Sequence, residues 1–348
     1  MRLRSVGDVV LLTPPLAALH SWRPDLRLSV LIERGCKPIL EGNPAVAEIL
    51  VARDFLSTVR DLRRCRFAVA YNQHGGPRSA ILTAASGAPV RVCWGGTQFS
   101  FLYNVLVPRP AAEEGQARSH TVEHRMMQFY WTGLPPGPIP PTAVYPHRGA
   151  ATLMEQVLAE RGIAPGAPYA VLRPGAATFT KRWAPEHFAA IARWLRETHG
   201  LVPVVDLGPG ERGIAEAIHD SLGPQSIVLH SLSLRELIAL IAGAQLFVGN
   251  DTGPTHIAAA LGRPCVAIFG SSNPANWRPW SAEHRVVAND FPCNPCPGDR
   301  CYAFPEPRCI LSVTVDQVRD ACEALITEQG RAGRVGPDPN ALKAEIRK

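Results

Sequence analysis

The sequence lacks any apolar run long enough to cross a bilayer. A spanning helix needs about 20 consecutive apolar residues, whereas the longest apolar runs here have the length of a strand. A basic run with interleaved aromatic residues is also missing, which argues against a nucleic-acid partner. No internal repeat of solenoid period is present. These absences favour a soluble, globular protein that binds no nucleic acid.

The amino terminus does not read as a signal peptide. Two arginines precede an apolar stretch, but Asp8 and the Pro14–Pro15 pair interrupt it, and no small-residue cleavage site follows cleanly. We therefore expect a cytosolic chain. The formal net charge of +6 favours phosphorylated ligands or an acidic surface without specifying either.

Strand-like runs recur along the 348 residues, with helical segments between them. They cover 27–33, 46–51, 67–73 and 90–95 in the first half, and 169–175, 201–208, 226–231, 245–251 and 264–270 in the second. Several are apolar at consecutive positions, which is typical of parallel strands covered by helices on both faces. The pattern predicts an α/β fold with two doubly wound domains.

Prolines mark the expected boundary between these domains. Segment 133–146 carries five prolines between positions 135 and 141, which cannot continue a helix or a central strand. We expect one domain over 1–140 and a second over 141–328. The polar residues 329–348 are expected to form a disordered tail. In the second domain, the sequence predicts a helix that ends at Gly200 and another that begins with a Ser233/Glu236 capping box.

The first polar cluster marks a strand-to-helix turn and the second directly follows a predicted strand, and doubly wound sheets bind ligands at such strand ends. In "RSVGDVV", Asp8 lies at a tight turn and either caps a helix or accepts a proton from a hydroxyl nucleophile. In "RPGAATFTKRW", Gly175 lets backbone amides approach an anion and Lys181 supplies positive charge. The alternative for the second cluster is a solvated loop, because it is neither a Walker A loop nor GxGxxG.

The third cluster is "NDTGPTHIAAALG". Pro254 suits the first turn of a helix, so Thr252 and Gly253 lie near amides that favour phosphate. Asp251 is then placed to bind sugar hydroxyls, and Thr255 and His256 to donate to a diphosphate. Alternatively, Asp251 or Thr252 only caps the helix and His256 is a half-buried residue with satisfied hydrogen bonds.

In their order along residues 1–325, these clusters and "GNPAVAEILV" resemble glycosyltransferase family 9, the ADP-heptose:lipopolysaccharide heptosyltransferases. The resemblance implies a GT-B fold with an acceptor-binding first domain and a nucleotide-sugar-binding second domain. It implies inverting transfer of heptose from ADP-heptose to the lipid A–Kdo inner core, without a cofactor, at the cytosolic face of the inner membrane. The segment that contains "RPGAATFTKRW", which we call the phosphate-side loop, is most similar to that of heptosyltransferase II.

The resemblance also implies roles for single residues. Asp8 falls on the proposed general base, and Lys181 on the lysine that meets the phosphates. Residues expected to hold the donor are Gly175, Thr178, Asp251, Thr252, Gly253, Thr255 and His256. Some relatives have two threonines where this chain has Ala176 and Ala177, and here Thr178 and Thr180 are expected to substitute. Relatives also begin with more apolar residues, so the chain start is expected to be placed late.

Four cysteines cluster in a Pro/Gly-rich segment: Cys293, Cys296, Cys301 and Cys309. The spacing is a candidate tetrahedral thiolate site for structural zinc or an iron–sulfur cluster, although it matches no standard finger. Reduced thiols or redox-sensitive pairs are the alternative. Three rival functions remain open: another family 9 transferase with a different donor or acceptor, a GT-B-like nucleotide-sugar epimerase, and a non-catalytic nucleotide-binding protein.

Overall fold

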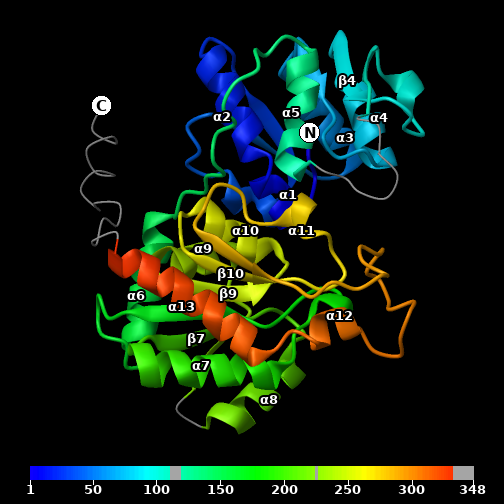
Figure 1. The fold of residues 1–348 in the computed structure, drawn as a ribbon. Helices are drawn as coiled ribbons and strands as arrows, with labels where there is room; N and C mark the ends of the chain where they lie inside the picture. Colours follow the sequence, from blue (N-terminus) through cyan, green and yellow to red (C-terminus); the bar gives the residue numbers. More distant parts are fainter. Residues whose placement is uncertain (110–118, 224–225, 332–348) are drawn as a thin grey trace.

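A computed structural model describes residues 1–109, 119–223 and 226–331 (Figure 1). Most of the expected tail, residues 332–348, lies outside this part of the chain. The first three residues assigned to that tail, 329–331, instead end a helix, α13 (Val315–Arg331). None of the described helices is long and apolar enough to span a bilayer.

The amino-terminal unit is built from short parallel strands. They are β1 (Ser29–Glu33), β2 (Glu48–Ala52), β3 (Val69–Tyr71), β4 (Val90–Trp94) and β5 (Val105–Val107), paired as β1–β2 and β3–β4–β5. The helices are α1 (Val6–Val10), α2 (Thr13–Trp22), α3 (Phe55–Arg64), α4 (Pro77–Ala85) and α5 (Thr121–Trp131), with 3-10 turns η1 (Arg34–Ile39) and η2 (Ser100–Leu102). In Figure 1, α2 lies on one side of this unit and α3 and α4 on the other.

The first residues of the chain join the two small sheets. The Arg2 amide donates to the Leu31 carbonyl in β1 (3.1 Å), and the Gln73 amide, just beyond β3, donates to the Met1 carbonyl (2.9 Å). This extended backbone therefore fills the central strand position. Because α1 follows directly, Asp8 lies at the carboxyl edge of the sheet, where doubly wound folds bind ligands.

The carboxy-terminal unit contains one six-stranded parallel sheet in the order β11–β10–β9–β6–β7–β8. The strands are β6 (Tyr169–Arg173), β7 (Val202–Leu207), β8 (Ile227–His230), β9 (Leu246–Asn250), β10 (Cys265–Ile268) and β11 (His284–Val287). The other helices are α6 (Arg148–Ala159), α7 (Pro185–His199), α8 (Arg212–Leu222), α9 (Leu234–Gly243), α10 (Gly253–Ala260), α11 (Pro274–Trp277) and α12 (Arg308–Leu311), with η3 (Phe179–Lys181).

The predicted elements are confirmed with few exceptions. All nine expected strand segments contain a strand, α7 ends at a left-handed Gly200, and α9 begins with the Ser233/Glu236 capping box. Strands β5 and β11, of three and four residues, were not predicted from the sequence. Residues 134–147 form no helix or strand, as expected of a linker. The domain limits at 140 and 141 stay a prediction.

One apolar core runs through both units. It includes Val9 and Ile32 from the amino-terminal unit, Val144 from the linker segment, and Phe247 and Ile257 from the carboxy-terminal unit, all at most 5% exposed. On the face of the large sheet that contributes to this core, the covering helices are α6, α9 and α10. On the other face, α7 and α13 enclose a separate core. The two units therefore share buried surface on the side of α1 and α10.

Candidate functional site

The carboxyl edges of the two units meet where α1 packs on α10. A methyl group built on Gly7 would lie 2.8 Å from Cδ2 of His256, and one built on Gly253 would lie 3.0 Å from Cγ1 of Val6. At such distances, a side chain at either glycine would force its neighbours to move. The backbones of the first and third predicted clusters thus lie against each other, although about 250 residues separate them in the chain.

Asp8 completes a capping box on α1. Ser5 is the N-cap residue, and its amide and hydroxyl donate to Oδ2 of Asp8 at 3.2 and 3.0 Å. Oδ1 accepts from Nη2 of Arg125 at 2.5 Å and also pairs with Arg2. Asp8 is therefore the third helical residue, not the N-cap itself, and its carboxylate is anchored from two sides.

These contacts set the charge of the Asp8 carboxyl. Burial raises its pKa, but the positive charges of Arg125 and Arg2 outweigh that effect and lower the pKa to about 2. Burial and the charge of Arg2 lower the pKa of Arg125 to about 10. At neutral pH the site therefore holds a carboxylate between two guanidinium groups.

Lys181 and Asp251 form a further ion pair of the site. Nζ of Lys181 donates to Oδ2 of Asp251 at 2.7 Å, with the lysine side chain 30% exposed and the aspartate side chain 5% exposed. Lys181 ends η3, and Asp251 follows β9 directly. The partly exposed lysine can therefore reach a ligand at this edge, whereas the aspartate is fixed beneath it.

The turn between β9 and α10 leaves the helix start uncapped. Thr252 occupies the N-cap position, but its side chain makes no capping hydrogen bond to the helix. The carboxylate of Asp251 pairs with Lys181 instead. The expected alternative, that one of these residues only caps α10, therefore does not describe this turn. An uncapped helix start is suited to bind an anion.

Thr255 and His256 are both buried in α10. The Thr255 hydroxyl donates to the Asn250 carbonyl at 2.5 Å, so its expected hydrogen bond to a phosphate stays a prediction and would require this bond to break. Burial lowers the pKa of His256 and keeps the imidazole neutral. Its Nδ1 is buried without a hydrogen-bond partner in the described part of the chain, and an unpaired buried polar atom of this kind is consistent with a ligand contact.

Gly175 lies against a carboxylate that the sequence analysis missed. A methyl group on Gly175 would lie about 2 Å from the Glu211 carboxyl group. Glu211 accepts from the Gly208 amide at 2.7 Å and from Arg173 at 3.1 Å. A signal was present, because "DLGPGE" is a polar end of a predicted strand. Arg2 and Arg125 were also missed, and neither carries a local motif.

Asp206 lies beside the same arginine at the end of β7. Its Oδ2 is 3.3 Å from Nη1 of Arg173. Burial raises the pKa of Asp206 to about 6, with the Arg173 charge opposing and the Glu211 charge reinforcing that shift. Arg173 thus pairs with two carboxyl groups, those of Asp206 and Glu211.

The phosphate-side loop uses its threonines in different ways. Thr178 is the half-buried N-cap of η3, and its carbonyl accepts from the Lys181 amide at 3.2 Å. Thr180 is buried and donates to the Gly298 carbonyl, while Ser271 donates to its hydroxyl oxygen at 3.2 Å. Thr180 therefore faces the cysteine segment, and its expected phosphate contact stays a prediction that would require its bond to Gly298 to break. A phosphate contact by Thr178 likewise stays a prediction.

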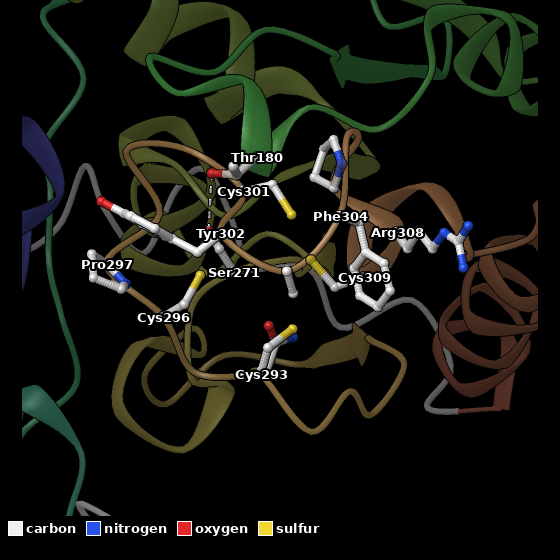
Figure 2. A pocket seen from close by; sticks show the side chains of 13 residues that line it. Thr180, Ser271, Cys293, Cys296, Pro297, Cys301, Tyr302, Phe304, Arg308 and Cys309 are labelled. Carbon is white, nitrogen blue, oxygen red and sulfur yellow. Dashed lines mark hydrogen bonds between the residues drawn. The ribbon is translucent and has the colours of Figure 1, made fainter.

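The four clustered cysteines surround one cavity of about 240 Å³ (Figure 2). All nine cysteines of the chain are free thiols. Within the described residues, no three His, Cys, Asp or Glu side chains lie close enough together to hold a metal ion. Cys293, Cys296, Cys301 and Cys309 line this cavity without forming such a group, so the expected tetrahedral zinc or iron–sulfur site is not supported.

Comparison with known proteins identifies one family. The model of glycosyltransferase family 9 (heptosyltransferase) matches residues 55–304. Lipopolysaccharide heptosyltransferase 3 of Escherichia coli is 27% identical, over 80% of this chain and 85% of that protein. Lipopolysaccharide heptosyltransferase 1 of Pseudomonas aeruginosa is 26% identical, over 94% of this chain and 97% of that protein.

A solved structure shows the same architecture. The chain superposes on E. coli ADP-heptose lps heptosyltransferase II with a TM-score of 0.79 and 24% identity, over 95% of this chain and 100% of that one. This likeness confirms an α/β fold of the GT-B type. Asp8 lies outside the matched family region, so its place in the site rests on the contacts of α1 with α10.

Proposed function

Because the chain belongs to glycosyltransferase family 9, we propose that it transfers heptose from ADP-heptose to the inner core of lipopolysaccharide. The observation that carries this proposal is the contact between α1 and α10. It brings the carboxylate of Asp8 to the same edge as the Lys181–Asp251 pair and the uncapped start of α10. An inverting transfer needs these two parts, a base and a site for a departing diphosphate.

The donor-binding part consists of the α10 turn and the phosphate-side loop. In the proposal, Lys181 and the amides near Gly253 stabilise the diphosphate, and Asp251 binds sugar hydroxyls beside the lysine. His256 contributes its unpartnered Nδ1. Thr252 and Thr255 shape the turn, while Thr178 and the backbone near Gly175 line the opposite side. All positive charge at the leaving group comes from these protein groups in the proposed reaction, which uses no metal ion.

The chemical step exchanges one bond at the anomeric carbon. The acceptor hydroxyl oxygen forms the new glycosidic bond while the bond from that carbon to the diphosphate breaks, and ADP leaves with the electron pair. Attack opposite the leaving group inverts the configuration. Asp8 accepts the hydroxyl proton. A carboxylate whose pKa is about 2 is a weak base, so it accepts this proton after bond formation has made the hydroxyl acidic.

The proposed acceptor is the lipid A–Kdo core at the cytosolic face of the inner membrane, and the proposed type is heptosyltransferase II. The type rests on the likeness of the phosphate-side loop, "GAATFTKRW". Named relatives of types 1 and 3 are similarly distant, at 26% and 27% identity. The acceptor specificity therefore requires a direct test.

The test is incubation of the purified full chain with ADP-heptose and a panel of truncated core oligosaccharides. Mass spectrometry should find one added heptose on an acceptor that already carries the first heptose, together with an equal amount of ADP. Addition to the Kdo-only acceptor would indicate a type I enzyme. Release of free nucleotide without any acceptor, or turnover of a UDP-sugar alone, would favour the epimerase and contradict the proposal.

A further inference from the structure

Helix α3 carries an outward stripe that combines arginine with large apolar side chains. Leu56, Arg60 and Arg64 are spaced by four residues and therefore share one side of the helix. All three are exposed, while Thr58 and Leu62 are buried beneath the helix. We call Phe55, Leu56, Arg60 and Arg64 the α3 face.

The apolar end of the α3 face is unusually exposed. Leu56 is 78% exposed and its neighbour Phe55 is 50% exposed. Other exposed apolar side chains of this unit are Ile81 on the adjoining α4, at 46%, and Phe101 on η2, at 78%. Exposed apolar side chains of this size, next to charged ones, are typical of an interaction site.

The excess of positive side chains lies mainly in the amino-terminal unit. Residues 1–109 contain 14 Lys and Arg against 7 Asp and Glu, whereas residues 119–331 contain 17 against 19. On α3, Asp61 is paired with Arg53 at 2.5 Å, and Asp54 caps the helix. Within the described residues, Arg60 and Arg64 form no ion pair. Their charge is therefore available to an anionic partner.

We propose that the α3 face docks on the surface of an anionic phospholipid bilayer. Phe55 and Leu56 would enter the boundary between headgroups and acyl chains, and Arg60 and Arg64 would lie against the anionic headgroups. This inference extends the proposed function, because a lipid-anchored acceptor must be met at a membrane. Helix α3 begins after the carboxyl end of β2, at the same sheet edge as Asp8, so the α3 face starts at the edge that carries the proposed acceptor site.

The experiment measures binding of the full chain to vesicles by sedimentation. One set of vesicles contains phosphatidylcholine alone, and the other contains phosphatidylcholine with phosphatidylglycerol. Arg60→Gln/Arg64→Gln should weaken binding to the anionic vesicles about thirtyfold, at about fivefold per arginine. Phe55→Ser/Leu56→Ser should weaken it about tenfold or more. Matched controls on exposed positions of the other unit are Arg148→Gln/Arg196→Gln and Leu153→Ser/Leu311→Ser.

The wild-type chain should bind anionic vesicles, lose binding as salt rises, and bind phosphatidylcholine alone far more weakly. The controls should bind as the wild type does. Equal binding to both kinds of vesicle, no binding to either, or equal losses in the controls would overturn the inference. Heptose transfer to a water-soluble acceptor should be unchanged in the α3 variants. If the wild type lacks that transfer but binds anionic vesicles, the proposed function fails and the docking surface stands.

Discussion

Asp8 combines a largely buried carboxylate with a pKa of about 2, which requires its two arginine partners. The Arg125 side chain is only 6% exposed. If Asp8 became alanine, a buried guanidinium would lose a charged partner, which typically costs about 3–5 kcal/mol of stability. Truncation at position 8 would therefore mix a loss of catalysis with a loss of folding. Asparagine is the better probe, because it keeps an oxygen that accepts from both arginines.

We expect Asp8→Asn to lower kcat about 10²- to 10⁴-fold, the usual contribution of a well-placed base. The variant should also unfold a few degrees lower at pH 7. The stability from this ionised group, about 2 kcal/mol for a pKa lowered from 3.8 to about 2, exists above pH 4 and is lost as pH falls through 2. Steady-state kinetics and thermal unfolding check both effects. Near-normal turnover would remove Asp8 from the role of base.

The pH dependence of kcat gives a second test at this residue. With a pKa of about 2, Asp8 should produce no fall in kcat between pH 8 and pH 4 at saturating substrates. Replacing Arg125 by methionine removes one of the two charges that lower this pKa, so burial raises it by about one unit or more. In Arg125→Met, the fall of kcat on the acid side of its pH profile should therefore occur at a higher pH. If kcat falls at the same pH in both proteins, Arg125 does not determine the pKa of Asp8.

Single residues were predictable from sequence only where a local motif carried them. Gly7, Asp8, Lys181 and Asp251 stand in short polar segments next to predicted strands, and the structure brings them to one edge. Arg125 lies on α5, 117 positions from Asp8, and nothing near it in the sequence indicates that contact. Tertiary packing alone determines such pairs.

Among the elements, α1 and α10 depend on two glycines at their contact. We expect Gly7→Ala to push α1 away from His256, because the new methyl group would lie 2.8 Å from the imidazole. The displaced carboxylate of Asp8 should lower kcat/KM about 10²-fold. Gly35→Ala is the matched control, since nothing lies within 4 Å of its added methyl group. Equal kinetics in the two variants would contradict the importance of this contact.

Whole elements were easier to predict than their contacts. Short segments that are mostly apolar located most of the strands, because both faces of a parallel sheet are buried. Strands β5 and β11 were not predicted, because β5 has only three apolar residues between Asn104 and Pro108, and β11 itself contains a histidine and an arginine. The expected metal site in the cysteine segment is not supported for another reason: the spacing resembles a metal site, but spacing does not determine where side chains point in a loop without regular structure.

At the scale of the molecule, the two units share an apolar core across α1, α2, α9 and α10. We expect calorimetry to give a single unfolding transition, because neither unit buries that surface without the other. Leu62 is buried only within the amino-terminal unit and Leu325 only within the carboxy-terminal unit. Leu62→Ala and Leu325→Ala should each cost about 2–5 kcal/mol and lower the same transition. Two transitions, each moved by one variant, would contradict a shared core.

The glycine contact between α1 and α10 also constrains how such enzymes can be recombined. In a chimera that takes its first half from one heptosyltransferase and its second half from another, any residue other than glycine at the position of Gly7 would collide with His256. An exchange of the first half should therefore keep the glycine at this position.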